Sequence, residues 1–330
     1  MNQIIFGDCI ETMKDLISKG VKVQTCVTSP PYFGLRDYGV DNQIGLEETP
    51  QAYVDKMVEV FRCVKDLLAD DGTLWLNLGD SYFSTTKGSG GSNPENSPFQ
   101  NRKGKNNFQG FESRKFSAGN TSCKPKDLIG IPWRVALALQ ADGWYLRQDI
   151  IWAKPNPMPE SVTDRCTKSH EYIFLMSKNP KYYFDHEAIK EPSINPESYK
   201  GRKKRSSMTE QSEILMGRFG ETRKGFNNIK EGKTYTTKNK RSVWTQTVKP
   251  YKGAHFATFP TQLIEPCVLA GSRIDDIVFD PFMGSGTTAQ VAIENGRQYL
   301  GCELNPEYKK LQDERIAKAY GVKKTPLPMG

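Results

Sequence analysis

Short apolar runs alternate with amphipathic segments along most of this chain, and this alternation limits the folds that it can adopt. Apolar runs bounded by turn residues predict strands at Gln3–Phe6, Val23–Thr28, Thr73–Leu78, Leu146–Trp152, Tyr172–Met176, Ile277–Phe279 and Tyr299–Cys302. Apolar residues at helical spacing predict helices at Ala52–Ala69, Pro132–Ala141, Thr261–Ala270, Thr287–Glu294 and Glu307–Ala319. Strands that alternate with helices indicate an α/β fold with a doubly wound, mostly parallel sheet, in which ligands bind at the carboxyl ends of the strands.

Charge is distributed unevenly along the sequence. The 330 residues carry a formal net charge of +8, but residues 185–252 hold 16 basic and 8 acidic residues, and residues 81–126 hold 8 and 2. The remaining body is therefore acidic, at −6. Both basic inserts contain scattered aromatic side chains, which favours base stacking and phosphate contact, although solvated loops would carry the same charge. We expect 81–126 to be a flexible basic loop and the polyanionic partner to be a nucleic acid.

The composition argues against several other classes of protein. No window approaches about 18 consecutive apolar residues, and no basic region precedes an apolar run at the N-terminus, so we expect neither a membrane span nor a secretory signal. Seven cysteines without a Cys-x-x-Cys pair and three isolated histidines predict no disulfide framework and no metal site. These features suit a reducing cytoplasm.

One strand end that could carry chemistry is the turn Thr28-Ser29-Pro30-Pro31-Tyr32, directly after an apolar run. Two prolines fix the backbone and remove two N–H donors, so the turn is rigid and its carbonyl groups are available as acceptors. An amino group on a planar base could donate to the Ser29 oxygen and the Pro30 carbonyl while the Tyr32 ring stacks on the base. An ordinary Pro-Pro turn that closes a strand is the alternative.

A second strand end lies in the stretch FDPFMGSGTT, where an apolar run ends at Asp280 and a turn with Gly284 and Gly286 leads into a helix. Glycine allows a ligand to approach the backbone, and the helix N-terminus offers N–H donors. Glu303 ends the following apolar run, where a carboxylate can bind both hydroxyl groups of a ribose. A loose dinucleotide pattern fits the same residues, so the stretch indicates an adenosine-bearing cofactor without specifying which one.

Together, these two turns, with SPPY early in the chain and DPFMGSGTT late, resemble the motifs of the amino-directed DNA methyltransferases of the β arrangement. Further segments stand in the family's order. Gly7-Asp8-Cys9 resembles the early cofactor-contacting turn, and 74–82 (LWLNLGDSY) resembles the strand and loop after the catalytic motif. The segment 151–159 (IWAKPNPMP) resembles the border of the target-base pocket, and 255–260 (HFATFP) resembles the methionine-side cofactor motif.

The resemblance covers most of the chain and implies a class I methyltransferase fold, which is Rossmann-like. It implies S-adenosylmethionine as the cofactor and methyl transfer to the exocyclic amino group of a base flipped out of double-stranded DNA. The catalytic and cofactor domain would comprise 1–184 and 253–330, and the insert 185–252 would be the target-recognition region. A cognate restriction endonuclease and a second copy of the chain stay open as partners, in the cytoplasm of a prokaryotic cell or a phage-infected host.

Three groups of site residues follow from the turns, the resemblance and the basic segments. The catalytic residues are Ser29, Pro30, Pro31 and Tyr32. Cofactor contacts are expected from Asp8, Cys9, Phe256, Pro260, Asp280, Pro281, Phe282, Gly284, Ser285, Gly286, Thr287, Glu303 and Asn305. DNA contacts are expected from Arg36, Lys154, Arg202, Lys203, Lys204, Arg205, Lys240 and Arg241.

Several alternatives stay open at this point. In the family that the chain resembles, Ser before Pro-Pro is associated with cytosine N4 and Asp or Asn with adenine N6, so Ser29 favours cytosine and adenine is the alternative. Methylation at cytosine C5 needs a cysteine nucleophile. Pro266-Cys267 exists, but it falls in a predicted helix and is interpreted as a packed cysteine. The glycine-rich turn and Glu303 alone would also fit a nicotinamide-dependent oxidoreductase, and the basic inserts a nucleic-acid-binding protein without catalysis.

Overall fold

The structure, a computed structural model, divides the chain into two units. Unit 1 consists of Met1–Asp185 and Ser242–Gly330, and unit 2 of His186–Arg241. In unit 2, the described strands β6 (Glu191–Pro192) and β7 (Thr237–Lys238) form an antiparallel pair. The residues that the structure describes are 1–35, 37–40, 42–83, 123–193, 236–248 and 259–321.

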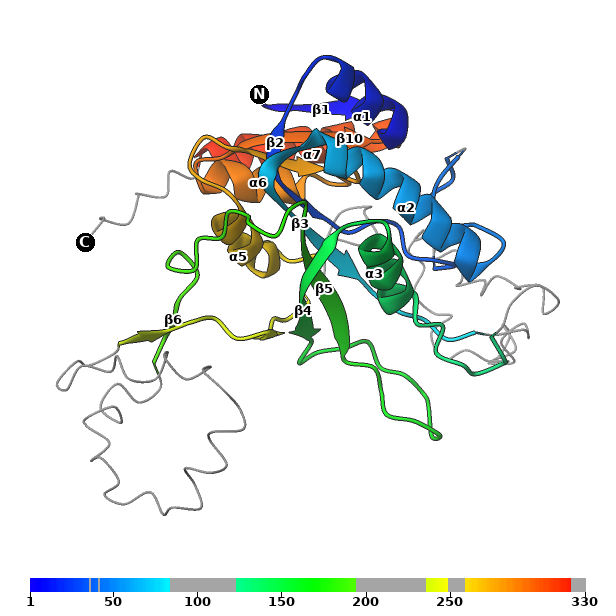
Figure 1. Cartoon of the computed structure of the whole chain (residues 1–330). Coiled ribbons are helices and arrows are strands. Elements are labelled where there is room, and N and C mark those ends of the chain that lie inside the picture. The colour runs from blue at the N-terminus through cyan, green and yellow to red at the C-terminus, as the bar shows by residue number, and fades with distance from the viewer. Residues whose placement is uncertain (36, 41, 84–122, 194–235, 249–258, 322–330) are drawn as a thin grey trace, which may run out of the picture. The chain divides into compact units, whose positions relative to one another are not determined.

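Unit 1 is built on an eight-stranded sheet with the strand order β1-β10-β9-β2-β3-β5-β4-β8 (Figure 1). Neighbouring strands are parallel from β1 to β3, antiparallel on both sides of β5, and parallel again between β4 and β8. The strands are β1 (Gln3–Phe6), β2 (Val23–Thr28), β3 (Leu68–Leu78), β4 (Tyr145–Ala153), β5 (His170–Ser177), β8 (Val243–Thr245), β9 (Ile277–Asp280) and β10 (Gln298–Glu303). The predicted α/β fold with a mostly parallel sheet is confirmed.

Helices pack in two groups, in which α1, α2 and α3 contact one another in sequence, as do α5, α6 and α7 (Figure 1). They are α1 (Cys9–Ser18), α2 (Pro50–Leu67), α3 (Ile131–Ala141), α5 (Thr261–Gly271), α6 (Thr287–Glu294) and α7 (Lys309–Gly321), the last preceded by a 3-10 turn, η3 (Pro306–Tyr308). From β9 the chain runs through α6 to β10 on one side, and from β2 through α2 to β3 on the other. Right-handed crossovers in opposite directions place α6 and α2 on opposite faces of the sheet. The switch point between β9 and β2 is where such sheets bind ligands.

Helix α2 begins and ends earlier than its apolar spacing predicts. It begins at Pro50, and the Thr49 hydroxyl oxygen accepts an N–H of the first turn at 3.1 Å. It ends at Leu67 because Leu68 already pairs with Val23 as the first residue of β3. Pairing across the sheet thus overrides the helical spacing of the sequence.

Helix α1 is missing from the predicted elements, although its signal is present in the sequence. Asp8 Oδ1 accepts the N–H groups of Ile10 at 2.9 Å and Glu11 at 3.0 Å, as a capping residue does. Met13 and Leu16 are buried on the same side of the helix. A capping aspartate followed by apolar residues at helical spacing is the pattern that identifies this helix.

Strand β8 lies inside the predicted insert 185–252 but extends the main sheet. Val243 pairs with Ile151, and the indole N–H of Trp152 donates to the Gln246 carbonyl at 2.8 Å. Three paired residues are too few to give a periodic signal in a sequence. Unit 2 therefore ends at Arg241, whereas the predicted insert extends to residue 252.

The predicted loop 81–126 is anchored at both of its ends. Phe83 is buried, and Tyr82 forms a β-bridge with Leu128. The backbone N–H of Phe83 donates to the Asp127 carbonyl at 2.8 Å. Residues 84–122 lie outside the described residues.

The composition argues against membrane-spanning helices and against metal sites. In the described ranges, no helix is both long and apolar enough to span a bilayer, and no cluster of three His, Cys, Asp or Glu side chains is placed to hold a metal ion. All seven cysteines are free thiols, and Cys267 is buried within α5.

Gly271 marks the closest approach of α5 to the sheet. A Cβ atom at this position would lie 2.7 Å from Thr25 Oγ1 and 2.8 Å from Trp75 Nε1. We expect Gly271→Ala to lower the free energy of unfolding by about 1–3 kcal/mol, because the buried neighbours would have to move. Gly321→Ala, at a position with no atom within 4 Å, is the matched control and should be near neutral. Equal midpoints for the two variants in urea denaturation would contradict this packing.

Candidate active site

Asp280, at the end of β9, connects the carboxyl ends of the two central strands. Its Oδ1 accepts a hydrogen bond from Thr28 Oγ1 at 2.6 Å and from the Phe282 N–H at 3.0 Å, and its Oδ2 accepts from Thr288 Oγ1 at 2.6 Å. The side chain is buried, and this burial raises the pKa of Asp280 to about 6, against the opposing effect of the hydrogen bonds. Besides its place at the cavity described below, Asp280 holds the strand ends and the turn together through its carboxylate.

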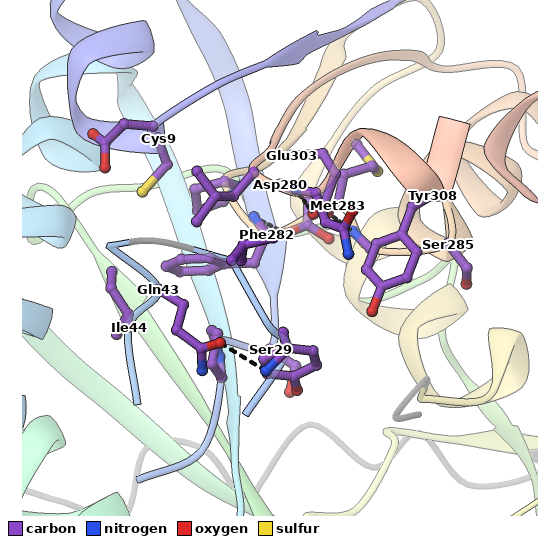
Figure 2. A pocket seen from close by; sticks show the side chains of 18 of the residues that line it. Cys9, Ser29, Gln43, Ile44, Asp280, Phe282, Met283, Ser285, Glu303 and Tyr308 are labelled. Carbon is purple, nitrogen blue, oxygen red and sulfur yellow. Dashed lines mark hydrogen bonds between the residues drawn. The ribbon is translucent and has the colours of Figure 1, made fainter. Parts of the chain in front are cut away.

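A cavity of about 930 Å³, its open mouth included, lies at these strand ends. It is lined by the turn before α1, the Pro-Pro turn and the loop after it, the glycine-rich turn and the end of β10. Figure 2 shows Cys9, Gln43 and Ile44 on one side of the cavity and Ser285 and Tyr308 on the other. The predicted residues that line it are Asp8, Cys9, Ser29, Pro31, Asp280, Pro281, Phe282, Gly284, Ser285, Thr287, Glu303 and Asn305. One cavity therefore brings the two turns together.

The other predicted cofactor residues are placed differently. Pro260 is buried at the start of α5, and its neighbour Phe259 lines the cavity instead. Gly286 precedes α6 with a positive φ of 84°, and its N–H donates to the Met283 carbonyl at 3.0 Å, so it shapes the turn. Phe256 lies outside the described residues.

The loop after the Pro-Pro turn supplies lining residues that the sequence analysis does not identify. Gln43 Oε1 accepts the Tyr38 N–H at 2.6 Å, and Ile44 is buried beside it. Gly45 approaches Pro31, since a Cβ atom there would lie 3.3 Å from Pro31 Cβ. This loop has no apolar periodicity that could have indicated its position. Gly7 and Met283, which lie within the predicted motifs but outside the predicted contacts, also line the cavity, as do Val40, Asn42, Leu304 and Tyr308.

Glu303 presents a fixed carboxylate at the end of β10. Its Oε2 accepts the Gly284 N–H at 2.7 Å, and its Oε1 accepts the Asn305 N–H at 2.8 Å. Burial raises the pKa of Glu303, and these backbone donors act in the opposite direction. Each carboxylate oxygen keeps acceptor capacity toward the cavity, as two neighbouring hydroxyl groups of a sugar would require.

Cys9 and Ser285, two predicted cofactor contacts, present surfaces of different polarity to the cavity. Burial, assisted by the Asp8 carboxylate, raises the pKa of Cys9 to about 12, so its thiol is a neutral, largely apolar surface. Asp8 also caps α1, as its contacts with the first turn show. The Ser285 hydroxyl group is buried and has no hydrogen-bond partner within the described chain. An unpaired buried hydroxyl that lines a cavity is a natural contact for a ligand.

The hydroxyl groups of Tyr53 and Tyr32 anchor the Pro-Pro turn to the surrounding protein. Tyr53 donates to the Pro31 carbonyl at 2.9 Å, while Ser29 and Pro31 line the cavity. The Tyr32 hydroxyl donates to Glu171 Oε2 at 2.8 Å. Burial, and then the Glu171 carboxylate, raise the pKa of Tyr32 well above its usual range. A Cβ atom at Gly79 would lie 2.5 Å from Tyr32 Cε2, so the absence of a side chain there makes room for the ring.

The predicted DNA contacts are only partly described. Lys154 forms an ion pair with Glu171 and lies over the Trp152 ring at 4.1 Å, with its side chain 17% exposed, so its ammonium group faces the protein and not an open surface. Lys240 pairs with Glu191 at 3.0 Å within unit 2. Arg241 ends unit 2. Arg36 and the run from Arg202 to Arg205 lie outside the described residues.

The comparisons with known proteins agree with this geometry. A family model described as DNA methylase matches residues 23–314. The chain is 45% identical over 315 residues to the Type II methyltransferase M.SmaI of Serratia marcescens, covering 95% of this chain and 90% of the relative. In fold it is similar to a putative DNA modification methylase from Thermus thermophilus complexed with S-adenosyl-L-methionine (TM-score 0.56, 21% identity, 97% and 94% covered). It is also similar to the PvuII DNA methyltransferase, described as cytosine-N4-specific (TM-score 0.57, 17% identity, 97% and 91% covered).

The chain belongs to the DNA methylase family of the N6 and N4 type. It is an S-adenosylmethionine-dependent DNA methyltransferase that acts on an exocyclic amino group. This finding confirms the predicted resemblance, enzyme class and cofactor, and it sets aside the oxidoreductase alternative. The cavity suits that cofactor, because Glu303 can bind the ribose hydroxyl groups, Ser285 offers an unpaired hydroxyl, and Cys9 and Phe282 provide apolar surface.

Glu303→Gln should weaken binding of S-adenosylhomocysteine by about 10- to 100-fold. The amide cannot accept from both backbone N–H groups and also from a sugar, since one of its ends is a donor. Isothermal titration calorimetry measures the change. Glu307→Gln, at an exposed position outside the cavity, is the control and should bind normally. Equal affinities of all three proteins would exclude a role for Glu303 in cofactor binding.

Asp280→Asn should change how stability depends on pH. A folded-state pKa of about 6, above the ordinary value of 3.8, means that the folded protein retains this proton between about pH 4 and 6. The stabilising contribution of Asp280 is therefore complete below pH 4 and is lost as the pH rises through 6. The unfolding free energy of the variant, minus that of the wild type, should rise by up to about 3 kcal/mol across this window. Urea titrations at several pH values test this, and a constant difference would contradict it.

Proposed function

We propose that this chain methylates cytosine N4 at a specific sequence in double-stranded DNA, after flipping the cytosine out of the helix. The single observation that supports this best is that Ser29 and Pro31 line the same cavity as Glu303 and Gly284. A methyl donor held by the second pair would therefore face a base held by the first. Ser29, rather than Asp or Asn, precedes the two prolines, which favours cytosine over adenine N6 in this family.

The residues of the Pro-Pro turn would prepare a poor nucleophile. A base amino group delocalises its lone pair into the ring, and hydrogen bonds to Ser29 Oγ and the Pro30 carbonyl would favour a more tetrahedral nitrogen. When it is bound, S-adenosylmethionine supplies a methyl group on a sulfonium centre. The chain itself contributes positioning and electrostatics, which account for most of the rate gain in reactions of this kind.

Flipping the base costs about a few kcal/mol in lost stacking and pairing. The Tyr32 ring would offset part of this cost by stacking on the flipped base. Its hydroxyl contact with Glu171 and the space at Gly79 fix the orientation of the ring before DNA arrives. Sequence recognition would come from the basic insert 185–252, including Arg202, Lys203, Lys204, Arg205, Lys240 and Arg241.

Adenine N6 is the alternative target, because the stacking ring and the two acceptors would accommodate either base. The relative M.SmaI is named a Type II methyltransferase, which supports a cognate restriction endonuclease acting on the same DNA site. The site of action would be the cytoplasm of a prokaryotic cell.

Expression in cells that lack DNA methylation, followed by mapping of modified bases at single-nucleotide resolution, tests the proposal. We expect N4-methylcytosine at one short sequence. N6-methyladenine would move the assignment to the alternative, and DNA without any methylated amino group would exclude both.

Tyr32→Ala should lower turnover by about 10-fold or more, because the loss of the stacking contact alone implies a loss of at least this size. Binding of S-adenosylhomocysteine should be unchanged, because Tyr32 does not line the cofactor cavity. Gly79→Ala provides a second test that leaves Tyr32 in place, since its new methyl group would displace the ring. Calorimetry and a methyl-transfer assay separate the two effects. An equal loss of turnover and cofactor affinity would argue against the stacking role.

A further inference from the structure

A chain of hydrogen bonds leads away from the catalytic turn into the protein. Ser29 Oγ donates to the Tyr32 hydroxyl at 3.4 Å, and the Tyr32 hydroxyl donates to Glu171 Oε2 at 2.8 Å. Ser29 directly follows β2, whereas Glu171 lies in β5, on the far side of β3. The sheet thus connects Ser29, the predicted acceptor of the amino group's hydrogen bond, to a carboxylate that the sequence motifs do not include.

Four polar side chains surround the carboxylate of Glu171. Its side chain is 16% exposed, and its Oε1 forms an ion pair with Lys154, after β4. Asn77 Nδ2, from β3, lies 3.4 Å from Oε2. Lys168 lies just before β5. Burial lowers the pKa of its ammonium group, and the nearby Glu171 carboxylate acts in the opposite direction. Tyr32 completes this set.

A purely structural role does not account well for this charge. Exchange of a buried ion pair for apolar side chains is often neutral or stabilising, so ion pairs in such places are weak evidence of a stabilising role. A carboxylate joined by hydrogen bonds to a catalytic turn is, in contrast, a candidate for proton transfer.

We infer that Glu171 is the final acceptor of the proton that the target amino group loses, relayed through Ser29 and Tyr32. The inference rests on the proposed function, and it holds for cytosine N4 and adenine N6 alike.

Methyl transfer to a base amino group forms one bond, breaks another and moves three protons. The nitrogen lone pair forms the new N–C bond, the S–C bond breaks, and its electron pair stays on sulfur. The nitrogen becomes positively charged and releases one proton to Ser29 Oγ. The Ser29 proton moves to the Tyr32 oxygen, and the Tyr32 proton moves to Glu171 Oε2. Serine and tyrosine end unchanged, and the carboxylate has become a carboxylic acid.

The neighbours of Glu171 suit this role. The raised pKa of Tyr32 means that its hydroxyl relays a proton without becoming an anion itself. Lys154 gives the carboxylate a counter-charge before transfer, and after transfer the unpaired ammonium group favours return of the proton to water. Positive charge that develops on the nitrogen in the transition state would also be stabilised along the hydrogen-bond chain. Lys154 is then a positioning residue for Glu171.

Two variants test the relay. Glu171→Gln keeps an oxygen that accepts from Tyr32 but cannot take a proton, and Tyr32→Phe keeps the ring and the Lys154 ion pair but breaks the chain. Each should lower the single-turnover rate of methyl transfer by about 100-fold or more. Glu59→Gln, which removes an exposed carboxylate that pairs with Lys56 at 2.7 Å on α2, is the control and should keep the wild-type rate.

Two further measurements separate proton transfer from positioning. With DNA that carries 2-aminopurine at the mapped target position, the fluorescence change on binding should be the same for Glu171→Gln and the wild type. The single-turnover rate of the wild type should be slower in D2O than in H2O, because three protons move along the chain, and this isotope effect should be absent from Glu171→Gln. If that variant melts at a much lower temperature, Tyr32→Phe decides.

A Glu171→Gln rate equal to the wild-type rate would overturn the relay. A 2-aminopurine signal lost in proportion to the rate would also overturn it, because Glu171 would then act only by holding Tyr32. Both results differ from failure of the proposed function, in which the wild-type protein itself would produce no methylated amino group.

Discussion

The buried carboxylate of Asp280 is the interaction on which both halves of the site depend. Thr28, at the end of β2, donates to one of its oxygens at 2.6 Å, and Thr288, in the first turn of α6, donates to the other at 2.6 Å. Because β9 leads into the glycine-rich turn and β2 into the Pro-Pro turn, this one side chain fixes the two turns relative to each other. Its burial opposes ionisation, and three hydrogen-bond donors offset part of that cost.

A hydrogen-bonded link is well suited to this position. Apolar packing is non-directional, so it would bring the two turns near each other without fixing their orientation. Methyl transfer requires a donor and an acceptor at about 3–3.5 Å in a defined direction, and a small misplacement is costly. Hydrogen bonds weaken steeply when they bend, so the Thr28 contact restrains direction as well as distance. The switch point of the sheet provides the crevice, and Asp280 provides its geometry.

The parts of the fold that local patterns determine could be predicted from the sequence. Strand β2 has the sequence VQTCVT, in which β-branched residues predominate, and its observed bounds, Val23–Thr28, are the predicted ones. The lining positions of Ser29 and Glu303 follow in the same way from their places at strand ends. Strand β8 could not be predicted, because it is defined by its partner β4 and not by its own three residues.

The side-chain roles that depend on distant partners could not be predicted either. Lys154 stands in a segment that resembles a pocket border, and a lysine in such a segment suggests a phosphate contact. Its actual partner, Glu171, lies on the neighbouring antiparallel strand, and no spacing rule in one sequence reveals that pairing. Asp280 is a similar case, since its place after a strand suggests a ligand contact, whereas its bonds to Thr28 and Thr288 depend on the assembled sheet.

Ser29 and Glu171 are connected only through Tyr32, and this separation gives a physical reason for an uncharged residue at the catalytic turn. An aspartate before the two prolines would place a carboxylate directly against the base amino group, where it could accept both the hydrogen bond and the proton. A serine hydroxyl accepts the hydrogen bond but cannot keep the proton, so the charge must be supplied elsewhere. On the proposed relay, Glu171 supplies it from β5, and Lys154 balances it away from the base. The hydrogen-bond acceptor and the proton acceptor are then separate residues, which leaves the edge of the bound base in contact with neutral groups only.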